Sequence, residues 1–363
     1  MAPTLLIGSC HPFSGKSAVV LGLARQLLQQ GVAVRFGKPL ATSFTPDPSS
    51  GTTELIDDDV RFVGSLLGLA SDQLLPSLEV LDAASAHGRL MEGRRESGPA
   101  FELLSRRLEA YGDGVTVLEA AGTLSEGLLY GLGLRRLAMA FSAPVVLVHL
   151  WEDSRSVDAL LEAHEQLGDH LAGVVLNAVV PDQVPEVRSE VVPALERLGL
   201  PVFGVMPRSP LLRSVTVEEL AERLGANVLC CRERLDLLVE TLSIGAMNVN
   251  SAMEFFRRRR NMAVVTGADR TDIQLAALEA STQCLILTGA GEPLPQLINR
   301  AEELEVPILK VEHDTLTTVE VIEKAFGHVR LHETVKAAYA FRLVQEHCSF
   351  SRLFDRLRLP QAA

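Results

Sequence analysis

The sequence predicts an α/β protein with a parallel sheet that has helices on both faces. Short apolar, β-branched runs alternate with segments of helical periodicity along nearly all of the 363 residues. This alternation is the pattern of repeated βαβ units. The composition agrees, because 47% of the residues are hydrophobic and only 5% are aromatic. A core built mainly from Leu, Val and Ala suits buried parallel strands and the helices that cover them.

The expected strands of the first half end at residues that can take part in chemistry. We expect these strands at residues 4–8, 32–37, 115–119, 145–149, 173–177 and 202–205, with helices between most of them. Ligands of such sheets bind at the carboxyl ends of the strands. The segment 8–17 and the residues Lys38, Glu119 and Asn177 stand at these ends, so they are the first candidates for function.

The βα alternation lapses near residues 207–240 and then restarts. A short strand is expected at 227–231, and further strands at 263–266, 284–288 and 308–310 are each followed by a helical pattern. At roughly 100–200 residues per domain, the length predicts two domains. We expect a first domain at 1–212, a smaller α/β domain at 213–335 and a helical tail at 336–363, packed on either domain.

Charge and cysteine content exclude several classes of protein. The net charge is −12 and the pI is near 5.3, which argues against general nucleic-acid binding. The arginine run 257–260 follows an apparent helix, and we interpret it as a solvated helix end, with an anionic-ligand site as the alternative. Five cysteines without a C-x-x-C spacing predict a reduced, cytoplasmic protein without structural zinc. No apolar run approaches the about 18 residues of a membrane span.

A phosphate-binding loop is the most informative motif. An apolar run ends at Gly8, a loop follows through Ser14, and residues 18–30 are apolar at helical spacing after Gly15-Lys16-Ser17. In such a loop, backbone N–H groups and the helix N-terminus face the phosphates. Lys16 would place a charge on the terminal phosphates, and the Ser17 hydroxyl would bind Mg²⁺.

The loop departs from the usual pattern at one position. Cys10 stands where the pattern has a glycine five positions before Gly15. The alternative interpretation is therefore an ordinary strand–helix turn with a solvated Lys16. The strand before the loop and the helix after it favour nucleotide binding.

Further polar residues stand at the other strand ends. Lys38, followed by proline, would direct an ammonium group into the cleft, although an exposed strand-end lysine is the alternative. Three consecutive aspartates open a helix, and Asp57 or Asp59 could hold hydrated Mg²⁺ or simply suit the helix dipole. Glu119 precedes small residues and could also face a metal. Asn177 could contact a nucleotide base or form a turn.

Together these motifs resemble dethiobiotin synthetase and its relatives among the P-loop NTPases. The counterparts are GSCHPFSGKS from Gly8, KPLATS from Lys38 and EAAG from Glu119. The loop is one residue longer than in that family, and Ala120 replaces a glycine. Nothing in the chain matches the segment of that family that binds diaminopelargonate.

The resemblance implies roles for the candidate residues. Lys16 and Lys38 would contact phosphates or an acidic substrate, and they would be catalytic if the chain is an enzyme. The oxygen ligands of Mg²⁺ would come from Ser17, Glu119 and one of Asp57 or Asp59. Asn177 would lie beside the base of ATP.

The second half contains Asp269-Arg270-Thr271 between an expected strand and a helix, which resembles the opening of a DRTGG domain. Asp269 or Thr271 can cap that helix, and Arg270 can pair with an acid or bind an anion. Both parts together resemble the amino-terminal region of long-form phosphate acetyltransferase over residues 3–335. Acetyl transfer resides in a separate carboxyl-terminal domain of that family, so we expect no acetyltransferase activity from the 363 residues.

Two functions remain after this comparison. The first is a regulatory or metabolite-sensing protein that binds ATP and Mg²⁺, expected as a homodimer, with a small acidic metabolite as a further ligand. The second is an ATP-dependent ligase that activates a carboxylate or a carbamate. The sequence leaves the natural ligand, the partner protein and the question of ATP hydrolysis open.

Overall fold

The computed structural model describes residues 2–45, 54–245 and 249–359. The chain forms two compact units, one made of Met1–Arg208 with Arg330–Ala363 and the other of Ser209–Val329. The carboxyl-terminal residues therefore belong to the first unit, which the sequence left open. The limits at residues 212 and 335 were expected for domains that fold independently. Independent folding is not tested by the structure, so these limits stay predictions.

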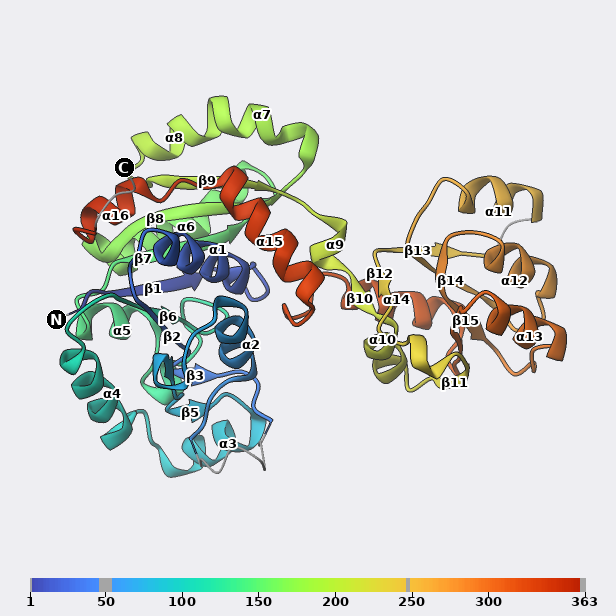
Figure 1. The fold of residues 1–363 in the computed structure, drawn as a ribbon, viewed down its shortest axis with the longest axis horizontal. Helices are drawn as coiled ribbons and strands as arrows, with labels where there is room; N and C mark the ends of the chain where they lie inside the picture. Colours follow the sequence, from blue (N-terminus) through green and yellow to red (C-terminus); the bar gives the residue numbers. More distant parts are fainter. Residues whose placement is uncertain (1, 46–53, 246–248, 360–363) are drawn as a thin grey trace. The chain divides into compact units, whose positions relative to one another are not determined.

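The first unit is built on a seven-stranded sheet with the order β4-β2-β6-β1-β7-β8-β9 (Figure 1). All its strand pairs are parallel. The strands are β1 (Thr4–Ser9), β2 (Val34–Gly37), β4 (Leu74–Leu75), β6 (Val115–Glu119), β7 (Val145–Leu150), β8 (Leu171–Val179) and β9 (Val202–Pro207). The order reverses at β1, which lies between β6 and β7. Such a switch point is where ligands of open α/β sheets bind.

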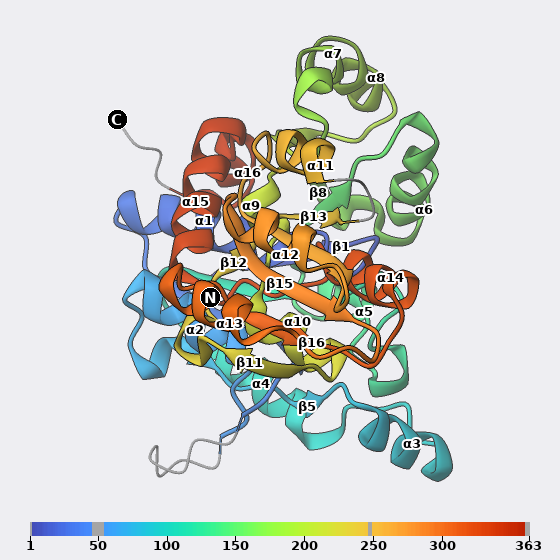
Figure 2. The same cartoon turned by 90° about the vertical axis from the view of Figure 1, so that its right-hand side faces the viewer.

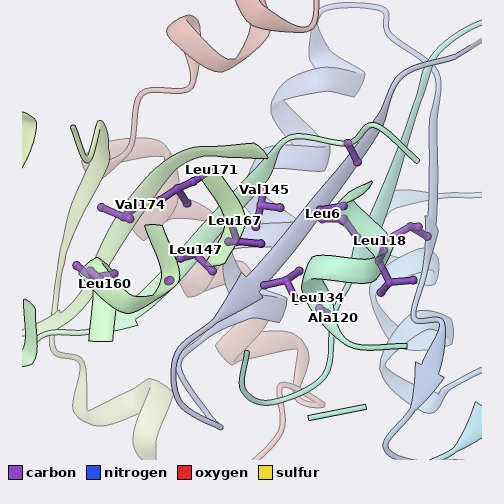
Figure 3. Close-up of a cluster of buried hydrophobic side chains, with 14 of the residues drawn as sticks. Leu6, Leu118, Ala120, Leu134, Val145, Leu147, Leu160, Leu167, Leu171 and Val174 are labelled. Carbon is purple, nitrogen blue, oxygen red and sulfur yellow. The ribbon is translucent and has the colours of Figure 1, made fainter. Parts of the chain in front are cut away.

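Helices cover both faces of this sheet, as the sequence predicted. On one face α5 (Leu134–Ala140) and α6 (Val157–Leu167) pack against the strands. Figure 3 shows Leu6 of β1 and Leu118 of β6 in a cluster with Leu134 of α5. On the other face lie α1 (Lys16–Gln29), α2 (Asp58–Leu67) and α15 (Thr334–His347). The remaining elements of this unit are β3 (Leu40–Ala41), β5 (Glu79–Val80), α3 (Ala83–Glu92), α4 (Gly98–Ala110), α7 (Val184–Glu186), α8 (Val192–Arg197) and α16 (Ser351–Arg356).

The carboxyl-terminal segment is an integral part of the first unit. A methyl group added at Gly22 of α1 would lie 2.4 Å from Cγ1 of Val344, so α15 packs closely on α1. After α15 the Ser349 N–H donates to the Phe203 carbonyl at 2.7 Å, which covers the edge of β9. The sequence predicted a helical tail at 336–363, and the structure has two helices, α15 and α16, with this edge contact between them.

The second unit contains a five-stranded sheet with the order β11-β16-β15-β14-β13 (Figure 2). Its strands are β11 (Asn227–Cys230), β13 (Thr241–Ile244), β14 (Met262–Gly267), β15 (Thr282–Thr288) and β16 (Ile308–Lys310), and only β11 is antiparallel. One face packs on α11 (Val249–Phe256), α12 (Thr271–Leu278) and α13 (Pro295–Glu303). The other face packs on α10 (Val217–Leu224) and α14 (Thr315–Ala325). The short elements β10 (Val215–Thr216), β12 (Leu238–Val239) and α9 (Pro210–Arg213) complete the unit.

Candidate functional site

The loop between β1 and α1 leaves the start of α1 open. Gly15 is the N-cap residue with φ +93°, in the left-handed region that favours glycine. A side chain at this position would also lie 2.4 Å from Nδ2 of Asn177. No side chain caps α1, and its first turn contains no acidic residue. The first N–H groups of α1 therefore have no side-chain acceptor, which is the arrangement of an anion site.

Lys16 is a buried cation at this helix N-terminus. The residue is only 8% exposed, and its Nζ donates to Oγ of Ser9 at 3.1 Å. None of the ion pairs found among the described residues includes Lys16. Burial lowers the pKa of Lys16, although the charge of Glu119 acts in the opposite direction. The loop thus presents a buried ammonium group to which no carboxylate of the described ranges is directly paired.

Ser17 and Glu119 form the second part of the site. Oγ of Ser17 donates to Oε1 of Glu119 at 3.2 Å. Oε2 of Glu119 is buried and has no hydrogen-bond partner within the described ranges. Burial raises the pKa of Glu119 against the opposing charges of Lys38 and Lys16.

The oxygens of Ser17 and Glu119 fit a magnesium ion. Mg²⁺ takes one or two carboxylates and fills its octahedron with water and phosphate oxygens. The unpartnered Oε2 of Glu119 offers such a ligand beside the Ser17 hydroxyl. Over the described ranges, no group of three or more His, Cys, Asp or Glu is arranged to hold a metal.

Lys38 differs from Lys16 because carboxylates surround it. Its side chain is 5% exposed, and its Nζ pairs closely with Asp59. Oδ1 of Asp57 lies 3.4 Å from Nζ of Lys38, and Oε1 of Glu119 lies 3.5 Å from it. Burial alone would lower the pKa of Lys38, but the charges of Glu119, Asp59 and Asp57 outweigh it and raise that pKa.

The beginning of α2 gives the consecutive aspartates different roles. Asp57 is the N-cap, and its Oδ1 accepts from the Asp59 N–H at 2.9 Å. Its Oδ2 accepts from the N–H groups of Thr42 at 2.7 Å and Ser43 at 3.1 Å. Asp58 accepts from the Ser43 hydroxyl at 2.6 Å. Backbone N–H groups therefore occupy both oxygens of Asp57, and the assignment of either Asp57 or Asp59 to a metal stays a prediction.

Asp59 also contacts a residue that sequence reasoning missed. Nε2 of His332 lies 3.1 Å from Oδ1 of Asp59. Burial would raise the pKa of Asp59, but the contacts with His332 and Lys38 hold it well below its usual range. The same contact raises the pKa of His332. No local sequence signal connects positions 59 and 332, so this pairing required the fold.

Asn177 contacts the loop itself in this structure. Its Nδ2 donates to the Ser14 carbonyl at 2.7 Å, and its Oδ1 accepts from the Ala178 N–H at 2.8 Å. Oγ of Ser14 is buried without a partner in the described chain. Gly8 lies in β1, where an added side chain would lie 2.5 Å from Cδ2 of Leu134. The contact of Asn177 with a base stays a prediction, whereas its support of the loop is observed.

The DRT segment forms a different kind of turn in the second unit. The N-cap of α12 is Arg270, and no side chain caps this helix. The interpretation of Asp269 or Thr271 as the cap is therefore wrong. Asp269 precedes the N-cap position, and Thr271 is already the first residue of α12. Nε of Arg270 lies 3.3 Å from Oδ1 of Asp272, so the arginine pairs with an acid.

The first unit has the fold and the loop of a P-loop NTPase, with an open helix N-terminus at the switch point of a parallel sheet. Residues 3–216 match the model of an AAA domain, and residues 219–325 match that of the DRTGG domain. The chain belongs to this AAA-domain family and contains a DRTGG domain after it.

Comparison with individual proteins gives the same two parts. The phosphate acetyltransferase of Nitratidesulfovibrio vulgaris is 24% identical over 98% of this chain and 52% of its own length. The ATP-dependent dethiobiotin synthetase of Pseudomonas aeruginosa is 32% identical over 57% of this chain and 90% of its own length. Among solved structures, the septum site-determining protein MinD of Pyrococcus horikoshii, complexed with Mg-ADP, has 16% identity and a TM-score of 0.36 over 59% of this chain and 84% of that one.

The chain spans about half the length of the phosphate acetyltransferases that it matches. The resemblance to dethiobiotin synthetase and to the amino-terminal region of phosphate acetyltransferase is thus confirmed. Within the described ranges, no helix has the length and apolar character needed to cross a membrane.

Proposed function

We propose that the first unit binds ATP with Mg²⁺ at the loop between β1 and α1, and that the chain is a regulatory or metabolite-sensing protein. The observation that supports this most strongly is Lys16, a buried ammonium group at an uncapped helix N-terminus that has no ion-pair partner among the described residues. Burying an unpaired charge is unfavourable. A bound phosphate would supply the missing anion.

Each residue of the site has a role in this proposal. Lys16 and the first N–H groups of α1 bind the β- and γ-phosphates. Ser17 and Glu119 hold the magnesium ion, which screens the phosphate charge when it is bound. Lys38 already pairs with Asp59, so a phosphate would compete with this carboxylate for the ammonium group. Asp59 would then face the water molecules around the metal.

The regulatory role rests on the relatives and is part of the proposal. Almost the whole chain corresponds to about half of a phosphate acetyltransferase. A cytoplasmic location, a homodimer and a small acidic metabolite as second ligand belong to the same proposal. The five free cysteines agree with a reducing compartment.

The second candidate is an ATP-dependent ligase that phosphorylates a carboxylate or a carbamate. The similarity to dethiobiotin synthetase over 90% of that enzyme favours it. Two lysines near the phosphates would stabilise the charge that develops on the transferred phosphoryl group.

Calorimetry with ATP, GTP and ADP, each with and without Mg²⁺, tests the proposal and separates the candidates. We expect magnesium-dependent binding of ATP that Lys16→Ala abolishes and that Lys324→Ala, an exposed control on α14, leaves unchanged. Binding without phosphate release would indicate a sensor. Phosphate release that rises with one carboxylate or amine would indicate a ligase. A wild-type chain that binds none of these nucleotides would contradict the proposal.

A further inference from the structure

A short segment returns the chain from the second unit to the candidate site. Residues 330–336, called here the return segment, begin directly after Val329, the last residue of the second unit. Arg330 donates from Nη2 to the carbonyl oxygen of Thr42, which follows β3. The ring of His332 lies 5.7 Å from that of Phe62 on α2. The return segment therefore contacts two elements that carry the site.

His332 is the first member of a series of polar contacts that leads to the phosphate-binding loop. Its Nε2 lies 3.1 Å from Oδ1 of Asp59, while Oδ2 of Asp59 pairs with Lys38. Nζ of Lys38 lies 3.5 Å from Oε1 of Glu119, and that same oxygen accepts from Ser17 at 3.2 Å. Each of these contacts joins elements that are distant in sequence.

We propose that His332 is a positioning residue of the nucleotide site, which rests on the function proposed above. The imidazole of His332 lies beside Oδ1 of Asp59 and shares this carboxylate with Lys38, so that Asp59 does not hold the ammonium group of Lys38 with its whole charge. Because His332 follows the second unit by three residues, the affinity of the first unit for nucleotide depends on how the chain returns from the second unit.

The loss of His332 should weaken nucleotide binding for an electrostatic reason. Oδ1 of Asp59 is buried, so without His332 that oxygen has no cation beside it. The carboxylate can then turn its whole charge toward Lys38 and hold the ammonium group away from a phosphate. Removing an outer partner of a metal site typically weakens binding about 10-fold to 100-fold.

The test uses the full chain with three substitutions. His332→Leu removes the contact with Asp59, and we expect the Kd for ATP with Mg²⁺ to rise about tenfold. His332→Gln places an N–H donor at similar reach, and we expect it to restore most of the affinity. Val335→Ala changes an exposed side chain of α15 and serves as the matched control. Calorimetry gives the Kd, and urea unfolding gives the stability of each variant.

The outcomes separate this inference from the proposed function. A wild-type Kd in His332→Leu, with binding still dependent on Lys16, would overturn the role of His332 and leave the nucleotide site standing. Equal weakening in His332→Leu and His332→Gln, parallel to equal losses of stability, would also overturn it, since it would show a merely structural residue. A wild-type chain that binds no nucleotide would overturn both.

Discussion

Two strand–loop–helix turns of this chain each place a basic residue before Ser or Thr at the start of a helix. They differ in how deeply that residue is buried and in whether it forms an ion pair. In the first unit β1 leads to α1 through Gly15-Lys16-Ser17, and in the second β14 leads to α12 through Asp269-Arg270-Thr271. Lys16 is 8% exposed and forms no ion pair among the described residues. The side chain of Arg270 is 37% exposed and pairs with Asp272, an acidic residue in the first turn of α12.

This difference favours the first turn as the one that would bind an anion. An exposed ion pair at a helix start is satisfied by its partner and by water, and such pairs contribute about 0–1 kcal/mol. A buried ammonium group without a counter-ion is unfavourable until an anion reaches it. A basic residue beside Ser or Thr at a helix start is thus not sufficient to identify an anion site. The burial of Lys16 and the lack of a direct ion pair to it among the described residues distinguish the first turn.

The largest expected effect comes from the buried charges of the first unit. Lys38→Ala leaves Asp59 and Glu119 without their shared cation, and removal of one partner from a buried pair costs about 3–5 kcal/mol. Arg270→Ala removes an exposed pair and should change the free energy of unfolding by at most about 0.5 kcal/mol. Urea unfolding at neutral pH compares them. Similar small losses in both variants would show that the cluster around Lys38 is not a buried network.

A pH effect of intermediate size is expected from His149, the last residue but one of β7. It is fully buried, its Nε2 lies 3.1 Å from Oγ of Ser156, and its ring lies 5.6 Å from that of His11. Burial, together with the charge of His11, lowers the pKa of His149 from 6.5 to about 4. Between these values the unfolded chain binds the proton and the folded chain does not, so stability falls as the pH falls.

The expected loss from His149 is about 2–3 kcal/mol between pH 6.5 and pH 4, at 1.36 kcal/mol for each pKa unit. His149→Gln should flatten this part of the profile of unfolding free energy, whereas His313→Gln, at an exposed position, should not. An unchanged slope in His149→Gln would contradict a neutral, buried His149.

A smaller effect is expected from the metal ligands. Glu119→Gln keeps the shape of the side chain but removes the charge beside Ser17. We expect the magnesium concentration needed for half-maximal ATP binding to rise about tenfold, because a carboxylate ligand is lost. Titration of Mg²⁺ at fixed ATP measures this shift. The same half-maximal concentration in wild type and Glu119→Gln would mean that Glu119 does not face the metal.

The sequence was sufficient for the sheet and for most of the site residues. The apolar run of β1 is buried along its whole length, and that of β7 at every position but the last, so their composition alone indicates central parallel strands. Because such strands end at the same edge, the sequence alone predicts that Lys16, Lys38 and Glu119 lie near one another. The short pairs β3–β5 and β10–β12 were missed, since strands of two residues leave no periodic pattern.

The remaining features depend on contacts between distant parts of the chain. Three consecutive aspartates are equivalent as a sequence pattern, and only the position at which α2 begins makes Asp57 its N-cap and turns Asp59 toward Lys38. His332 is separated from Asp59 by the whole second unit. No sequence motif marks His332, because its position beside Asp59 depends on where the chain re-enters the first unit after the second unit.

The most direct test of the central claim compares Lys16→Ala and Arg270→Ala in ligand-induced stabilisation. In the wild type, ATP with Mg²⁺ at about 100 times its Kd should add about 2.7 kcal/mol to the free energy of unfolding. We predict that Lys16→Ala loses most of this gain and that Arg270→Ala keeps it. If Arg270→Ala loses the gain while Lys16→Ala keeps it, the nucleotide binds at the other turn and the account is wrong.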